Sequence, residues 1–99
     1  SSAASDVYKR QVASIACAVN RKSRSLVTPV LVEMHGIPGG DDPELVKAVS
    51  KAVSNAIQRS LSKEEPPRET RKIARSALLS VLWERTNQRP LVIVNILEL

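Results

Sequence analysis

The sequence predicts an α+β fold: a two-layer sandwich in which two helices cover one face of a three-stranded sheet, in the order β-β-α-α-β. Three observations predict it. Extended segments rich in β-branched residues lie near the start and at the end of the chain, two segments with helical apolar spacing lie between them, and Pro- or Gly-rich breaks separate these pieces. A chain of 99 residues is long enough for one small domain with a thin core.

The first two expected strands form a hairpin. The stretch VASIACAV (12–19) presents an alternating core face, formed by Ala13, Ile15, Cys17 and Val19. The polar stretch NRKSRS (20–25) is typical of a hairpin tip. A second strand follows in LVTPVLVEMHG (26–36). Because Pro29 has no N–H for a ladder, we expect this strand to lie at the sheet edge or to bulge there.

Two helices are expected next. Asp42 can cap the first helix, and Pro43 and Glu44 suit its first turn. The apolar positions of this helix continue to about residue 61: Leu45, Val49, Ala52, Val53, Ala56, Ile57 and Leu61. After the polar break at 62–69, a second helix has its own apolar stripe: Ile73, Ala74, Ala77, Leu78, Val81 and Leu82. It ends near Asn87, since Pro90 prevents it from continuing.

The closing stretch RPLVIVNILEL (89–99) predicts a strand that is apolar on both sides. Leu91, Ile93, Leu97 and Leu99 point one way along an extended chain, and Val92, Val94 and Ile96 point the other way. Two helices can cover only one face of the sheet. We therefore expect the outer face to be buried in an interface, with these candidate residues: Leu91, Val92, Ile93, Val94, Ile96 and Leu97.

Composition bounds the class of protein. The net charge of +5 suits an RNA-handling protein, although ribosome-associated, membrane-peripheral and ordinary basic proteins share it. The single cysteine, Cys17, excludes an internal disulfide framework and fits a reducing compartment. No apolar run approaches the roughly 20 residues that span a bilayer, and the first residues do not resemble a signal peptide. We expect a cytoplasmic protein with no membrane partner.

The opening stretch SSAASDVYKRQ (1–11) is polar, small and unpatterned. Its DVYKRQ portion is what the nucleotides GAT-GTG-TAT-AAG-AGA-CAG encode, a string that resembles a transposase adapter used in sequencing libraries. We interpret residues 1–11 as a sequencing-adapter artefact, or else as a disordered leader, and leave them out of the fold. The domain is then expected to span residues 12–99.

Candidate catalytic chemistry is sparse in this sequence. A zinc site needs at least three converging ligands, but His35 and Cys17 are the chain's only imidazole and thiol and lie on different expected strands. No nucleophile is paired with a base, and no two carboxylates share a recognisable site. We therefore expect no catalytic residue, no metal site and no cofactor within this chain, while its status as part of an enzyme stays open.

The second helix carries one basic stripe. Arg68, Arg71, Lys72 and Arg75 recur at i, i+3, i+4 and i+7, and Arg85 and Arg89 follow nearby. Such a stripe can contact a phosphate backbone, and it can equally be a solvated helix face. Aromatic residues are not interleaved with it, which argues against sequence-specific reading of single strands. We expect Trp83 to be an anchor at the edge of the core rather than a stacking platform.

Residues 12–99 resemble the C-terminal domain of ribonuclease J. Four stretches carry the resemblance in order: the basic hairpin VNRKSRSLVTP, the strand and glycine of VEMHGIP, two helices with a polar break, and the ending ERTNQRPLVIVNILEL. Three residues depart from the family pattern, which usually has arginine where this chain has His35, an aromatic residue near Ile37, and often a proline in place of Val94.

The resemblance implies a part of a bacterial or plastid RNA-processing and decay enzyme. Its zinc-dependent metallo-β-lactamase and β-CASP domains, with all their zinc ligands, would lie upstream. This domain would be the accessory module associated with self-assembly and full activity, and its partners would be another subunit or the catalytic body, with RNA as a further partner. Two alternatives remain: a small independent RNA-binding α+β domain that uses the basic stripe, and an interaction or regulatory domain of a different enzyme.

Overall fold

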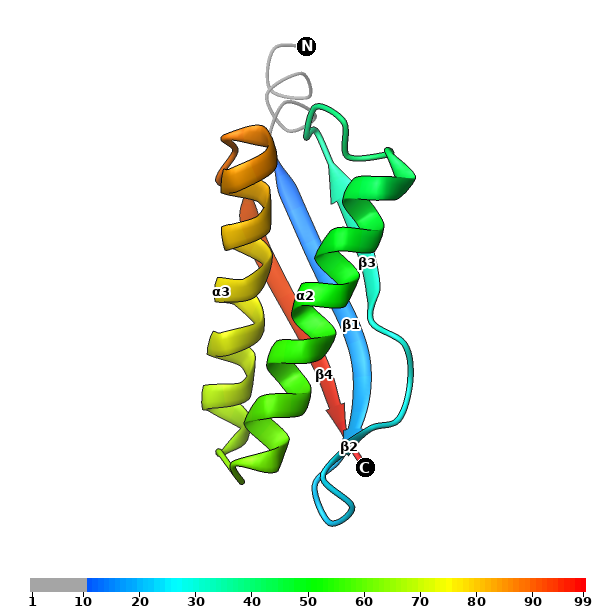
Figure 1. Ribbon diagram of the computed structural model, residues 1–99, viewed down its shortest axis with the longest axis vertical. Helices are drawn as coiled ribbons and strands as arrows, with labels where there is room; N and C mark the ends of the chain where they lie inside the picture. Colours follow the sequence, from blue (N-terminus) through cyan, green and yellow to red (C-terminus); the bar gives the residue numbers. More distant parts are fainter. Residues whose placement is uncertain (1–10) are drawn as a thin grey trace, which may run out of the picture.

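The computed structural model describes residues 11–99 and shows a two-layer α+β sandwich, with both helices on the same face of the sheet (Figure 1). The strands are β1 (Val12–Asn20), β2 (Ser25–Leu26), β3 (Leu31–His35) and β4 (Leu91–Glu98), and the helices are α2 (Pro43–Ser62) and α3 (Pro67–Thr86). The predicted class and element order are confirmed. The expected artefact or leader at 1–11 lies outside the described residues, apart from Gln11.

The sheet is mixed, and β1 is its central strand. β1 pairs in antiparallel fashion with β2 and then with β3 along one edge, and in parallel with β4 along the other edge. The sheet therefore has four strands and not the predicted three, because the expected strand at 26–36 is divided into β2 and β3. Both β3 and β4 are edge strands of this sheet.

The division between β2 and β3 follows from Pro29, which has no N–H to donate to β1. The register places four residues, 27–30, opposite only two residues of β1, Cys17 and Ala18. Val27 still donates its N–H to the Ala18 carbonyl at 2.8 Å. The Ala18 N–H then donates to the side-chain hydroxyl of Thr28 at 2.9 Å, which replaces the missing backbone acceptor. The predicted bulge is thus present.

The turn between β3 and α2 fits its sequence closely. Gly39 has a φ of 76°, a conformation that side-chain-bearing residues rarely adopt. A Cβ on Gly40 would lie 2.9 Å from the Ile37 carbonyl oxygen, so this position also requires glycine. The side chain of Asp42 accepts a hydrogen bond from the Glu44 N–H at 3.0 Å, and this confirms the predicted N-cap of α2.

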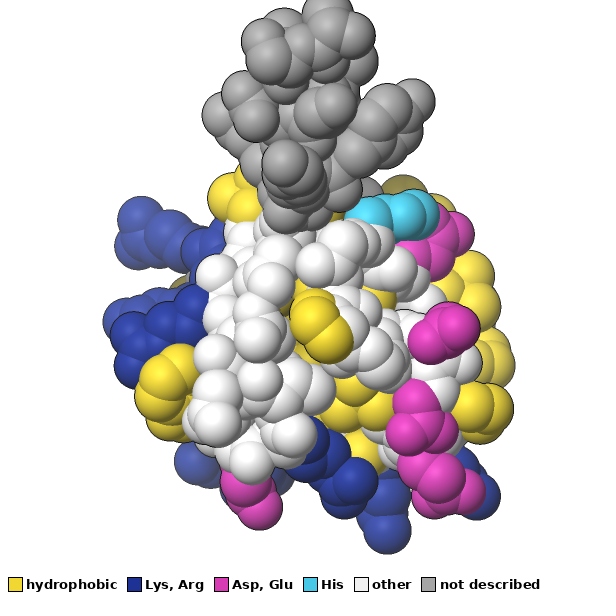
Figure 2. All heavy atoms as spheres, turned by 90° about the horizontal axis from the view of Figure 1, so that it is seen from above, with side chains coloured by type: hydrophobic (Ala, Val, Ile, Leu, Met, Phe, Trp, Pro, Cys, Tyr) yellow, Lys and Arg dark blue, Asp and Glu magenta, His cyan; other side chains and the backbone are white. Residues whose placement is uncertain are grey.

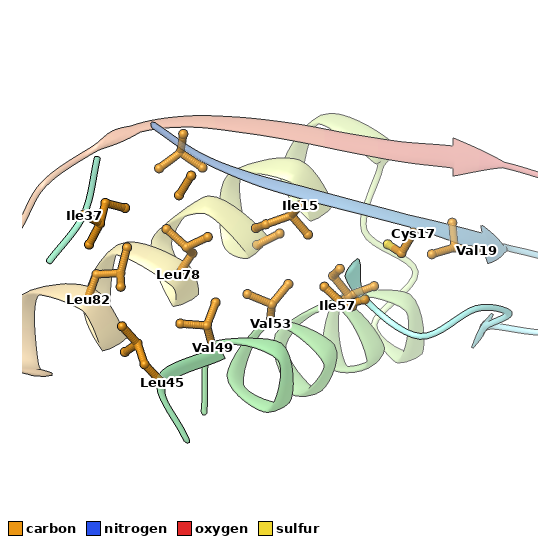
Figure 3. Packing of buried hydrophobic residues seen from close by; sticks show 14 of the residues in the cluster. Ile15, Cys17, Val19, Ile37, Leu45, Val49, Val53, Ile57, Leu78 and Leu82 are labelled. Carbon is orange, nitrogen blue, oxygen red and sulfur yellow. The ribbon is translucent and has the colours of Figure 1, made fainter. Parts of the chain in front are cut away.

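The core lies between the helices and the inner face of the sheet (Figure 3). The predicted core face of β1 is buried along its whole length, and so is most of the predicted stripe of α2. On α3, one residue of each successive turn is buried, and the other residues of the predicted stripe are partly buried. The cluster comprises Ala13, Ile15, Cys17, Val19, Val30, Ile37, Leu45, Val49, Val53, Ile57, Leu61, Ala74, Leu78, Leu82 and Val92. Within the described part of the chain, no helix is long and apolar enough to cross a membrane.

Helix α3 ends where the sequence predicts. Asn87 adopts a left-handed conformation with a φ of 55°, and its N–H donates to the Trp83 carbonyl at 3.0 Å. The chain then turns through Arg89 and Pro90 into β4. This path places the closing strand beside β1, on the side opposite β2 and β3 (Figure 1).

Candidate functional site

The outer face of the sheet, which the helices leave uncovered, carries most of the exposed large aliphatic side chains of the described chain. Leu31 on β3 and Leu91, Ile93 and Leu97 on β4 point to this face, and Val27 and Leu99 continue the alternation beyond β2 and β4. Together these six side chains are 44–67% exposed: Val27, Leu31, Leu91, Ile93, Leu97 and Leu99. We call this set the outer apolar strip.

The central strand makes the outer apolar strip concave. The outward residues of β1 between its ends are small: Ser14, Ala16 and Ala18. The register sets Ser14 beside Ile93 and Ala18 beside Leu97, so larger side chains rise along the β4 side of a shallow trough. A hollow of about 320 Å³ lies there, lined by Ala16, Cys17, Asn95, Ile96 and Leu97. Such a trough can receive side chains from a facing surface.

The structure settles which side of β4 faces the helices. The parallel register aligns Val92 with Ala13 and Val94 with Ile15, and both pairs belong to the core side. Val92 is only 8% exposed, whereas its neighbour Leu91 is 62% exposed. Of the six predicted interface residues, Val92, Val94 and Ile96 therefore face the core, and the outward ones are Leu91, Ile93 and Leu97.

The outer apolar strip has a polar border on the β3 side. Glu33 and His35 follow Leu31 on the same, outer face of this strand. A Glu33 carboxylate oxygen lies 3.7 Å from the His35 imidazole Nε2. His35 is exposed. Asn95 is also exposed, but it lies on β4 between Ile93 and Leu97 and so interrupts the strip itself. An apolar centre with polar residues at its margin is the usual anatomy of a protein–protein interface.

The predicted basic stripe lies on the solvent side of α3. Arg68, Arg71, Lys72 and Arg75 are all exposed, and none of them forms an ion pair with an acid within residues 11–99. Arg85 is also exposed, but it lies in the last turn of α3, more than two turns beyond Arg75. Figure 2 looks down on the end of the molecule opposite the start of α3, with the 36–42 turn, and shows Lys and Arg side chains mainly on the α3 side and along the helix layer, and most of the Asp and Glu side chains on the β3 side.

Trp83 does not anchor the edge of the core, contrary to our expectation. It is 48% exposed, because Leu78 and Leu82 already occupy the buried stripe of α3 and Trp83 lies about 100° from Leu82. The Arg89 guanidinium lies over the indole, 4.6 Å from the ring centroid, in a cation–π contact. A surface hollow of about 430 Å³ adjoins this pair, lined by Ser76, Leu79, Ser80, Trp83, Arg89 and Pro90.

The candidate metal ligands lie apart. Cys17 is buried on the core face of β1, and His35 is exposed on the outer face of β3. No group of three or more His, Cys, Asp or Glu side chains that could hold a metal occurs within the described residues. Burial, and to a lesser extent the charge of Glu98, raises the pKa of the Cys17 thiol above its ordinary value, which favours an unreactive thiol.

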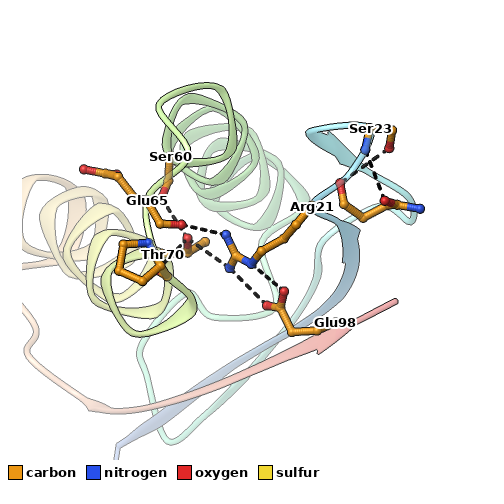
Figure 4. A network of polar contacts seen from close by, with 8 residues as sticks. Arg21, Ser23, Ser60, Glu65, Thr70 and Glu98 are labelled. Carbon is orange, nitrogen blue, oxygen red and sulfur yellow. Dashed lines mark hydrogen bonds and ion pairs between the residues drawn. The ribbon is translucent and has the colours of Figure 1, made fainter.

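One polar cluster escaped the sequence analysis (Figure 4). Arg21 binds both carboxylate oxygens of Glu98, with N–O distances of 2.6 and 3.1 Å, and it also donates to the Glu65 carbonyl at 2.8 Å. Its third partner is the hydroxyl of Thr70 at 3.3 Å, which is itself 2.7 Å from the buried Ser60 hydroxyl. Arg21 thus joins β1, the end of β4 and the connection between the helices.

A signal for this cluster was present in the sequence. Glu98 shares the side of β4 that carries Val92, Val94 and Ile96, where a charged residue departs from the apolar pattern. The register places Glu98 beside Val19, two residues before Arg21. Sequence reasoning did not find the pair because the two residues are 77 positions apart.

The fold and its surface define the class of this chain as a small two-layer α+β domain with one uncovered sheet face. The comparison with protein families identifies it further. The family model described as the ribonuclease J C-terminal domain matches residues 12–99, nearly the whole chain, and the chain therefore belongs to that family. The matched region includes the Arg21–Glu98 pair and the entire outer apolar strip. Among curated proteins, none matches this sequence significantly.

Proposed function

We propose that this domain is the accessory assembly module of a ribonuclease J-type enzyme of RNA processing and decay. The observation that carries the proposal is the outer apolar strip on the uncovered face of the sheet. Family membership supplies the enzyme context. In this proposal the domain contributes no catalytic residue. The hydrolytic zinc chemistry belongs to metallo-β-lactamase and β-CASP domains of the same enzyme, and the whole acts in the cytoplasm.

Burial of the strip favours association for a simple reason. Apolar surface removed from water contributes about 25 cal/mol per Å², and soluble monomers rarely leave contiguous aliphatic patches of this kind uncovered. Leu91, Ile93 and Leu97 lie on one edge strand, so a partner can cover them together. The partner in this proposal is a second copy of the domain or the catalytic body of the same enzyme.

The test is the mass of the chain in solution. Size-exclusion chromatography with light scattering should show dimers or larger species whose proportion rises with concentration. Leu97→Asp puts a charge into the strip at a side chain that is 62% exposed, so it should abolish association while the circular dichroism spectrum stays unchanged. Asn55→Asp adds the same charge to an exposed position of α2 and should leave association intact.

A second arm tests the other partner. The catalytic domains of a ribonuclease J are produced separately and mixed with the chain, and binding is measured by the same chromatography. A chain that stays monomeric at every concentration and does not bind these domains would sink the proposal. It would also fail if Leu97→Asp unfolded an isolated monomer, because both faces of β4 would then belong to one core.

A further inference from the structure

A single line of residues follows the solvent side of α3 and joins two features that the assembly role does not use. Its members recur at intervals of three or four residues along the helix: Arg68, Lys72, Arg75, Ser76, Leu79 and Trp83. They therefore lie on one side of the helix. The first half of this line is basic, and the second half is the hollow beside Trp83. We call it the α3 line.

The hollow has the chemistry of a nucleobase site. Trp83 offers a half-exposed indole, and the Arg89 guanidinium that lies over this ring is a second planar group on which bases stack. The hydroxyls of Ser76 and Ser80 border the same hollow, and Leu79 supplies an apolar floor. A stacking surface with hydrogen-bonding groups at its edge accepts any base and carries little sequence preference.

The basic half of the line has the chemistry of a phosphate-binding track. Helix α3 contains five basic residues against two acidic ones, and the four in its first half are exposed without an acidic partner in the described chain. From Arg68 to Trp83 the helix rises about 22 Å. A stacked strand carries one phosphate per roughly 3.4 Å, so the line matches about six nucleotides.

We propose that the α3 line binds single-stranded RNA, with one base stacked in the hollow of Trp83 and Arg89 and the neighbouring phosphates held by Arg75, Lys72 and Arg68. The α3 line lies on the helix layer and the outer apolar strip on the opposite face of the sheet (Figure 1). The domain can therefore bind RNA and a protein partner at the same time. An acidic protein surface is the competing occupant, but it would not require an exposed indole beside two hydroxyls.

The test uses the fluorescence of Trp83, which is the only tryptophan of the chain. Titration with a short oligouridylate should quench this fluorescence, because a stacked base contacts the indole directly. Inorganic polyphosphate of the same charge should compete for the basic residues without producing the quenching. Binding of a dye-labelled oligouridylate, followed by anisotropy, gives affinities for the variants as well.

The variants separate stacking from charge. Trp83→Leu should weaken binding about tenfold, the lower range for loss of one stacked base, and Trp83→Phe should retain most of the affinity. Lys72→Glu with Arg75→Glu should weaken binding further and flatten the dependence of log K on log salt by about 0.7 per lost phosphate contact. Lys47→Glu with Lys51→Glu, the matched pair on the exposed side of α2, should change the affinity far less.

Three results would overturn the proposal. Quenching by polyphosphate equal to that by oligouridylate would reduce the line to a general anion surface. Equal affinities of the parent chain and Trp83→Leu, with both folded by circular dichroism, would remove the base site. Quenching by separately produced ribonuclease J catalytic domains, with none by oligouridylate, would make the hollow a protein contact. The solution mass of the chain is measured separately, so none of these results decides the assembly proposal.

Discussion

The two faces of the sheet differ sharply although both are built from aliphatic residues. On the inner face Ala13, Ile15 and Val19 are fully buried beneath α2 and α3, whereas on the outer face Leu91 and Leu97 are each 62% exposed. The difference in exposure of these aliphatic side chains follows from the helix layer, which covers only the inner face. The helix layer turns one surface into a core and leaves the aliphatic side chains of the other exposed in this chain.

The largest expected loss of stability comes from a mutation that opens a cavity on the inner face. Leu78 is fully buried between α3 and the sheet, so Leu78→Ala should lower the free energy of unfolding by about 2–5 kcal/mol. The same truncation on the outer face, Leu97→Ala, should cost less than about 1 kcal/mol in a monomer, because that side chain is already mostly in water. Urea titrations at low protein concentration, followed by circular dichroism, measure both. Equal losses would erase the distinction between the two faces.

An intermediate loss of stability is expected when the Arg21 cluster, at the polar end of the inner face, is disrupted. Arg21→Ala removes a two-oxygen contact with Glu98 and leaves the Thr70 and Glu65 oxygens without this donor. We expect the free energy of unfolding to fall by about 1–2 kcal/mol, because the Arg21–Glu98 pair is only partly screened by solvent. Arg24→Ala breaks a more exposed pair with Glu64 and should cost less than about 0.5 kcal/mol. The same urea titrations apply, and a cost for Arg24→Ala that matched or exceeded the other would refute this ranking.

The smallest expected effect is a dependence of stability on pH that arises from the Cys17 thiol. Burial raises the pKa of its thiol in the folded state, so the unfolded chain loses this proton at lower pH than the folded chain. The contribution to stability is complete below the ordinary thiol pKa and is lost as pH rises through the folded pKa. The urea midpoint should therefore fall above about pH 9, and Cys17→Ala should flatten this part of the profile. Identical slopes for both chains in that range would contradict the expected burial.

Local signals predicted the elements well because their causes are local. Asp42 caps α2 through its own neighbour Glu44, and Asn87 ends α3 with a left-handed turn. Proline interrupts the hydrogen-bond ladder of any strand because it has no N–H. A bulge at Pro29 was therefore predictable, although the division into two strands was not. The basic residues of α3 were predicted to form a stripe from their spacing alone, and they are exposed together.

The position of Trp83 could not be read from its spacing. An aromatic residue one position beyond Leu82 fits either the edge of the core or the solvent side, depending on how α3 rotates against α2 and the sheet. Packing settled that rotation through Ala74, Leu78 and Leu82. The cation–π contact with Arg89 exists only because the chain turns back toward the helix before β4 begins.

The order of elements, the helix caps and the presence of more aliphatic surface than two helices can cover all follow from the amino-acid sequence, because periodicity and turn chemistry depend on neighbouring residues. Tertiary structure alone decided which side of β4 faces inward and which distant residues meet. Both sides of that strand are apolar, so its own residues do not discriminate between them. The parallel register with β1 does, since it aligns Val92 with Ala13 and brings Glu98 within reach of Arg21 across 77 residues.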